Sequence, residues 1–92
     1  MAKLERVLQG DFNHILSVIE QGILRGSISA SLEDASNWQE GNVRCAVRVF
    51  ERYSWLGGNR VSLSVTLLGV DGVNFLSAIT AGGSQAVFFK IN

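Results

Sequence analysis

The sequence predicts one α+β domain in two layers, with an N-terminal helix packed on a four- to five-stranded, mostly antiparallel sheet. Three observations predict this fold class. Residues 11–25 carry apolar side chains at helical spacing. Most later segments alternate apolar and polar residues, which is the period of a half-buried strand. A chain of 92 residues can fill one hydrophobic core but not two, so we assign residues 1–92 to a single domain.

The N-terminal part contains a short strand and the helix. Residues 3–9 form the predicted first strand. Asp11 is a suitable N-cap because its carboxylate can accept a free first-turn N–H. The apolar positions that follow share one helical face and should pack on the sheet: Phe12, Ile15, Leu16, Ile19 and Ile23. We expect Gly26 to end the helix in the left-handed conformation.

The rest of the chain reads as strands separated by turns. Residues 28–33 alternate as a strand, and residues 34–42 are polar, so we predict a loop there. Alternation resumes in three further segments, at residues 43–53, 61–67 and 73–80.

Two turns predict how these strands pair. A loop at Gly57-Gly58-Asn59 would set Val49 opposite Leu67 and Tyr53 opposite Leu63, so that apolar meets apolar. In that register Val43, Cys45, Val47 and Val49 face the helix. Asp71-Gly72 indicates a type I′ hairpin. This second turn predicts three further pairs: Leu76 with Leu67, Phe75 with Leu68, and Ile79 with Ser64.

These registers predict a partly apolar outer face, on the side of the sheet that a single helix cannot cover. The residues expected there are Phe50, Leu68, Phe75 and Ile79, beside Arg44, Arg48 and Arg52. An apolar face of this size indicates an interaction surface. We expect one of three covers: residues 85–92, a second copy in a symmetric dimer, or a small apolar ligand. Whether the residues after Gly83 form a helix or a strand stays open. The chain stops in an apolar run, so we expect it to extend beyond Asn92.

Composition excludes several classes of protein. Eight basic and eight acidic residues cancel, so no overall field attracts nucleic acid or an anionic membrane. No apolar run approaches the length of about 20 residues that spans a bilayer. Cys45 is the only cysteine and cannot form an intramolecular disulfide. These features predict a cytoplasmic protein without a membrane partner.

Few residues carry candidate chemistry. His14, the only histidine, lies in the first helical turn, where a solvated side chain is the simpler interpretation. Cys45 is interpreted as a buried apolar residue rather than a reactive thiolate. Ser84, after Gly82-Gly83, could offer an anion site at a helix start, but it lacks the lysine of a phosphate-binding loop. We predict no catalytic residue, no metal site and no cofactor.

Several segments together resemble one family. They are the runs from Gly26 to Asp34, from Val43 to Tyr53, from Gly57 to Arg60 and from Gly82 to Lys90. The combination resembles an uncharacterised bacterial family, a domain of unknown function of roughly a hundred residues. The resemblance implies a small cytosolic bacterial protein and supplies no activity, cofactor or site residue.

Three functional hypotheses follow. The first is a non-enzymatic interaction or small-ligand-binding domain that self-associates, as a dimer, through its sheet. The alternative is a nucleic-acid-binding module in which Arg44, Arg48 and Arg52 contact phosphates and Phe50 stacks on a base. The balanced charge disfavours this alternative. The third and least favoured hypothesis is an enzyme, because the sequence shows no nucleophile or acid–base pair that would come together in an active site.

Overall fold

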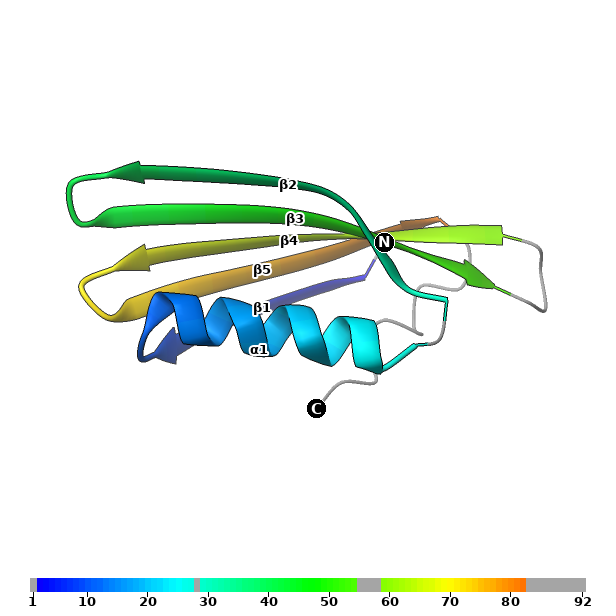
Figure 1. Cartoon of the computed structure of the whole chain (residues 1–92), viewed down its shortest axis with the longest axis horizontal. Helices are drawn as coiled ribbons and strands as arrows, with labels where there is room; N and C mark the ends of the chain where they lie inside the picture. The colour runs from blue at the N-terminus through cyan, green and yellow to red at the C-terminus, as the bar shows by residue number, and fades with distance from the viewer. Residues whose placement is uncertain (1, 28, 55–58, 83–92) are drawn as a thin grey trace.

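The computed structural model describes residues 2–27, 29–54 and 59–82. The elements are β1 (Lys3–Gln9), α1 (Phe12–Arg25), β2 (Ser31–Glu40), β3 (Val43–Ser54), β4 (Asn59–Val70) and β5 (Val73–Gly82). The five strands form one antiparallel sheet in the order β1-β5-β4-β3-β2 (Figure 1). The predicted α+β class, with one helix on an antiparallel sheet, is confirmed.

Helix α1 packs on what we call the inner face of the sheet. Leu16 and Ile23 are buried, and Phe12, Ile15 and Ile19 pack around two clusters that include Leu67 and Val65. The predicted helical face is therefore confirmed. Figure 1 shows α1 running along the sheet on the side of β1 and β5, with β2 at the far edge.

Both ends of α1 have defined caps. The Asp11 carboxylate accepts from the His14 backbone N–H at 2.9 Å, which confirms the predicted N-cap. The predicted left-handed Gly26 is wrong. Gly26 has a right-handed φ of −74° and donates to the Gly22 carbonyl, so the last turn closes as ordinary helix.

The hairpin between β4 and β5 forms as predicted. Asp71 and Gly72 have φ values of 51° and 79°, the two positive angles that a type I′ turn requires. Leu67 faces Leu76, Leu68 faces Phe75, and Ser64 faces Ile79. A two-residue turn leaves no freedom of register, which is why this pairing could be predicted from the sequence.

The predicted pairing of β3 with β4 is wrong. Val49 lies opposite Ser64 rather than Leu67, and Leu67 lies opposite Ala46. The shift is an odd number of residues, so it exchanges the two faces of β3. Phe50, predicted on the outer face, is fully buried, and Val43, Cys45, Val47 and Val49 lie on the outer face instead. The observed register places Phe50 in the core, and Arg48, which turns inward with it, is compensated by its ion pair with Glu20.

The predicted loop at residues 34–42 is also wrong. Strand β2 continues to Glu40 and pairs with β3, with a bulge between Leu32 and Asp34 and a turn at Gly41. All ten residues of β2 are exposed. An edge strand that is exposed to solvent on both faces needs no apolar alternation. The sequence therefore does not predict that the strand continues through residues 34–40. Residues 83–92 lie outside the described residues. The predictions that concern them, a helix or strand after Gly83 and a cover formed by residues 85–92, are therefore not tested.

Candidate functional site: the outer sheet face

The outer face is the side of the sheet opposite α1. Among the described residues, no helix or loop packs on it. Its centre is a line of cross-strand neighbours that crosses all five strands in register, one residue from each strand. We call this line the apolar row: Val7, Phe75, Leu68, Cys45 and Trp38. Every member is apolar, although the five positions are scattered along the sequence.

The row is markedly exposed. Val7 is 63% exposed, Trp38 57% and Phe75 46%. The parallel line towards the turns holds Val73, Val70 and Val43, flanked at the sheet edges by Gln9 and Glu40. Together these two lines make one contiguous apolar patch at the turn end of the sheet.

Away from the turns, the outer face becomes mixed. One line is mostly polar, with Thr66 and Ser77 at its centre. The next line holds Ile79 and Val49, with Ser64 between them. At the edges of this second line stand opposite charges, Lys3 on β1 and Asp34 on β2. The two edges of the face therefore differ in charge at this level of the sheet, and Lys3 also has Glu5 of its own strand at 4.0 Å.

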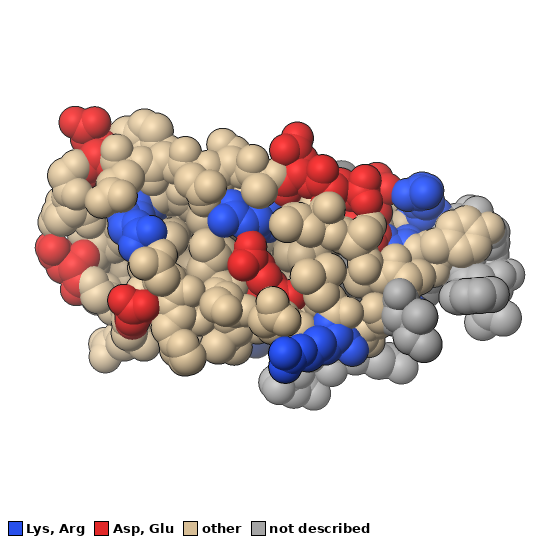
Figure 2. Space-filling view, viewed as in Figure 1, with Lys and Arg blue, Asp and Glu red and all other residues tan. Residues whose placement is uncertain are grey.

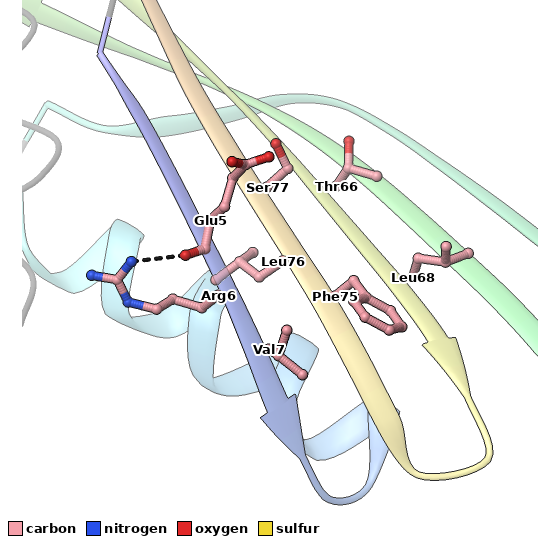
Figure 3. Close-up of a pocket in the computed structure, with 8 residues that line it drawn as sticks. All are labelled: Glu5, Arg6, Val7, Thr66, Leu68, Phe75, Leu76 and Ser77. Carbon is pink, nitrogen blue, oxygen red and sulfur yellow. Dashed lines mark hydrogen bonds between the residues drawn. The ribbon is translucent and has the colours of Figure 1, made fainter.

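A shallow groove of about 570 Å³ runs over this face between β1, β5 and β4. Figure 3 shows Val7, Phe75 and Leu68 following one another across these strands, with Glu5, Ser77 and Thr66 beside them. Arg6 turns back to donate from Nη1 to the Glu5 carbonyl at 2.7 Å. The groove is mainly apolar and open, so it suits a surface contact better than an enclosed small molecule.

Three of the four residues predicted for the interaction face lie on the outer face, namely Leu68, Phe75 and Ile79. Each is between 36% and 46% exposed. Phe50, the fourth, belongs to the core and cannot contact a partner. Sequence reasoning missed Val7, Cys45 and Trp38. A lone tryptophan in a polar segment was the only signal for Trp38, and the reversed face of β3 hid Cys45.

The predicted arginine contacts are not on the open face. Arg48 is 8% exposed on the inner side and forms an ion pair with Glu20 of α1. Arg44 stacks on the Phe12 ring, also on the helix side, and the Arg52 Nε is buried. Figure 2 shows the basic groups on this side separated from each other and interspersed with acidic ones. The basic, aromatic sheet face of the nucleic-acid alternative is therefore a wrong prediction, and Ser84 lies outside the described residues.

The remaining candidates have ordinary surroundings. His14 is exposed in the first turn of α1, and Cys45 is a half-buried free thiol. Within residues 2–27, 29–54 and 59–82, no three His, Cys, Asp or Glu side chains are grouped so as to hold a metal ion. The one helix described is too short to cross a bilayer.

The fold and the outer face thus define a small α+β protein with an apolar sheet surface. The chain belongs to a family of unknown function, DUF6054, whose model matches residues 1–92. The predicted membership of an uncharacterised family is confirmed to that extent. No curated protein matches the chain.

Proposed function

We propose that this protein is a non-enzymatic interaction domain that self-associates as a dimer through the outer face of its sheet. The observation that carries the proposal is the apolar row, which crosses all five strands in register on a face without a described cover. Fully burying one large apolar side chain is worth about 1.5–3 kcal/mol. A row of five half-exposed apolar side chains therefore supplies a real driving force for association.

The edge charges favour a second copy as the partner. A C2 contact brings the same patch of two copies together. Rotation by 180° about an axis parallel to β4 lays each line of residues over the same line in reverse order. Lys3 then faces Asp34 of the second copy, and Ile79 faces Val49. The opposite charges at the two edges become complementary across the contact.

The same rotation suits the apolar row. Leu68 lies on the central strand and meets its own copy, Phe75 meets Cys45, and Val7 meets Trp38. Large side chains thus face small ones on both sides of Leu68, as close packing of two sheets requires. The alternative axis, perpendicular to the strands, brings Val7 onto Val7 and Trp38 onto Trp38 and gives Lys3 no opposite charge from the second copy.

The area of the outer face determines the affinity that we expect for the dimer. Five strands about 4.8 Å apart and seven residues long present roughly 500 Å² of sheet per copy. The total of about 1,000 Å² is near the lower limit for a specific interface. We therefore expect a reversible dimer with a dissociation constant on the order of micromolar.

Sedimentation velocity over a concentration series tests the proposal. Wild type should shift from monomer to dimer, and Phe75→Lys should stay monomeric, because it buries an unpaired charge against Cys45 of the second copy. Val18→Lys is the matched control, since Val18 is 56% exposed but lies on α1. A wild-type monomer up to millimolar concentration would overturn the proposal. A small apolar ligand found by native mass spectrometry on such a monomer would favour ligand binding instead.

A charge exchange tests the orientation separately. Lys3→Asp and Asp34→Lys should each weaken the dimer, and the double variant should recover it. If Phe75→Lys abolishes the dimer while the charge variants have no effect, the face is right and the axis is wrong.

We also propose a cytoplasmic location in a bacterial cell. A single cysteine and the resemblance to a bacterial cytosolic family support it. Fractionation of cells that express the protein from its own gene tests it, and recovery in the membrane or secreted fraction would contradict it.

A further inference from the structure

A second depression lies on the opposite side of the molecule, between the start of α1 and the β2–β3 hairpin. Its volume is about 280 Å³. Helix α1 covers the inner face over β5 and β4 but not over β2, whose residues are all exposed. The groove is therefore bounded by α1 on one side and by β2 on the other, with β3 as its floor. Its lining includes Phe12, Asn13, Asn37, Gln39 and Arg44.

Arg44 is held in place within this groove. Its guanidinium carbon lies 4.5 Å from the centroid of the Phe12 ring, and its Nη2 donates to Asn13 Oδ1 at 2.7 Å. The stacking and this hydrogen bond fix the plane of the guanidinium before any ligand arrives. Of its five N–H groups, one has an acceptor among the described residues.

Among the residues that the structure describes, Arg44 differs from Arg48 in having no carboxylate partner. Arg48 pairs with Glu20 at 2.6 Å and also donates to the carbonyls of Ser36 and Val47. Within the described part of the chain, no acidic side chain lies within 4.0 Å of the Arg44 guanidinium. A half-buried arginine with free donors and no counter-ion is an anion-binding group in a suitable orientation.

Apart from Arg48, whose charge is paired with Glu20, the other polar side chains described in the groove are carboxamides. Gln39 lies directly opposite Arg44 on β2, and Asn37 lies two residues along on the same face. In the described residues, neither side chain forms a hydrogen bond, so both can donate to a ligand. No described aspartate or glutamate lines the groove. Phe12 and Leu16 supply apolar wall beside these donors.

We propose that this groove binds the carboxylate of a small organic acid. Arg44 supplies the charge and a planar pair of N–H donors that matches a carboxylate, while Asn37 and Gln39 donate to its oxygens. The apolar part of the acid packs on Phe12 and Leu16. One unpaired guanidinium balances one negative charge, so a monocarboxylate fits better than a doubly charged phosphate. This proposal does not depend on the dimer, because the groove is on the other face of the sheet.

Titration of ¹⁵N-labelled protein with sodium benzoate at constant ionic strength tests the proposal. The side-chain signals of Arg44, Asn37 and Gln39 should shift and saturate, with a dissociation constant on the order of 1 mM. Benzamide, which has the same shape without the charge, should give no saturable shift. Arg44→Gln should weaken binding at least tenfold. Arg60→Gln should leave it unchanged, because Arg60 is paired with Glu51 on the outer face.

Other outcomes would contradict the proposal. A linear response to benzoate, or the same affinity in Arg44→Gln, would show that Arg44 is structural only. Inorganic phosphate that binds more tightly than benzoate at the same signals would overturn the carboxylate assignment. The amide spectrum of each variant shows whether it has kept the fold. Arg44→Lys serves as the second variant, because it keeps the positive charge but lacks the planar pair of N–H donors.

Discussion

Arg48 and Glu20 form an ion pair that joins the sheet to the helix, with Nε and Oε2 2.6 Å apart and the two side chains 10% and 25% exposed. Two further bonds from Arg48 Nη1 reach backbone carbonyls of β2 and β3. Arg48 is therefore a satisfied buried cation. It fixes α1 over β3, and it explains why an arginine lies on the helix-covered face.

Removing one partner of this pair should destabilise the fold. Glu20→Gln leaves the buried Arg48 charge without a counter-ion, which typically costs about 3–5 kcal/mol for a fully buried pair and less here, because Glu20 is partly exposed. We expect a loss of about 2 kcal/mol in a urea titration. Glu51→Gln, which breaks the more exposed pair with Arg60, is the control and should cost under about 1 kcal/mol. Equal losses would contradict the structural role of Glu20.

Phe50 and Phe75 should respond in opposite ways to truncation. Phe50 is fully buried in the core, so Phe50→Ala should lower the free energy of unfolding by about 3–5 kcal/mol. Phe75 is 46% exposed on the outer face, so Phe75→Ala should cost under about 1 kcal/mol in the monomer. Chemical denaturation at low protein concentration, where the monomer dominates, measures both. A larger loss for Phe75→Ala than for Phe50→Ala would contradict the β3–β4 register of the structure and favour the register predicted from the sequence.

Two glycines offer a matched pair of alanine substitutions. At Gly69, an added Cβ would lie 2.6 Å from the Phe12 ring and 2.8 Å from Asn74 Oδ1. Gly69→Ala should therefore cost about 1–3 kcal/mol by overpacking. At Gly22, inside α1, an added Cβ meets no atom within 4 Å. Gly22→Ala should raise stability by up to about 1 kcal/mol through helix propensity. Thermal unfolding followed by circular dichroism distinguishes the two, and a stabilising Gly69→Ala would refute the close approach of Phe12.

Asn74 anchors the N-terminal strand from β5. Its amide nitrogen donates to the carbonyls of Leu8 and Gly10 at 3.2 and 3.0 Å, and the side chain is 1% exposed. Asn74→Leu removes both bonds and leaves two carbonyls without this donor, so we expect a loss of about 2–3 kcal/mol. Hydrogen exchange should show the largest loss of protection in β1. Asn42→Ala, at an exposed turn, is the control and should leave β1 unchanged.

The features that could be predicted are those fixed by neighbours in the sequence. The apolar face of α1 depends on residues that are three and four positions apart, and the N-cap depends on Asp11 and His14. The β4–β5 register depends on the Asp71-Gly72 turn. Each is a local preference that the surrounding fold did not oppose. The turn pairs Leu68 with Phe75 and Ser64 with Ile79, so these residues share one face of the sheet.

The tertiary structure decided what depends on distant segments. Alternation in β3 was clear, but both of its faces carry apolar residues, so only packing against α1 could choose Phe50 over Val49 for the core. Strand β2 carries mostly polar residues without apolar alternation and pairs through its backbone, so its side chains do not indicate a strand. The apolar row combines one residue from each of five strands, and a single change of register would break it. Local preferences in the sequence determined the elements of this protein, and long-range pairing and packing determined which residues its surface presents.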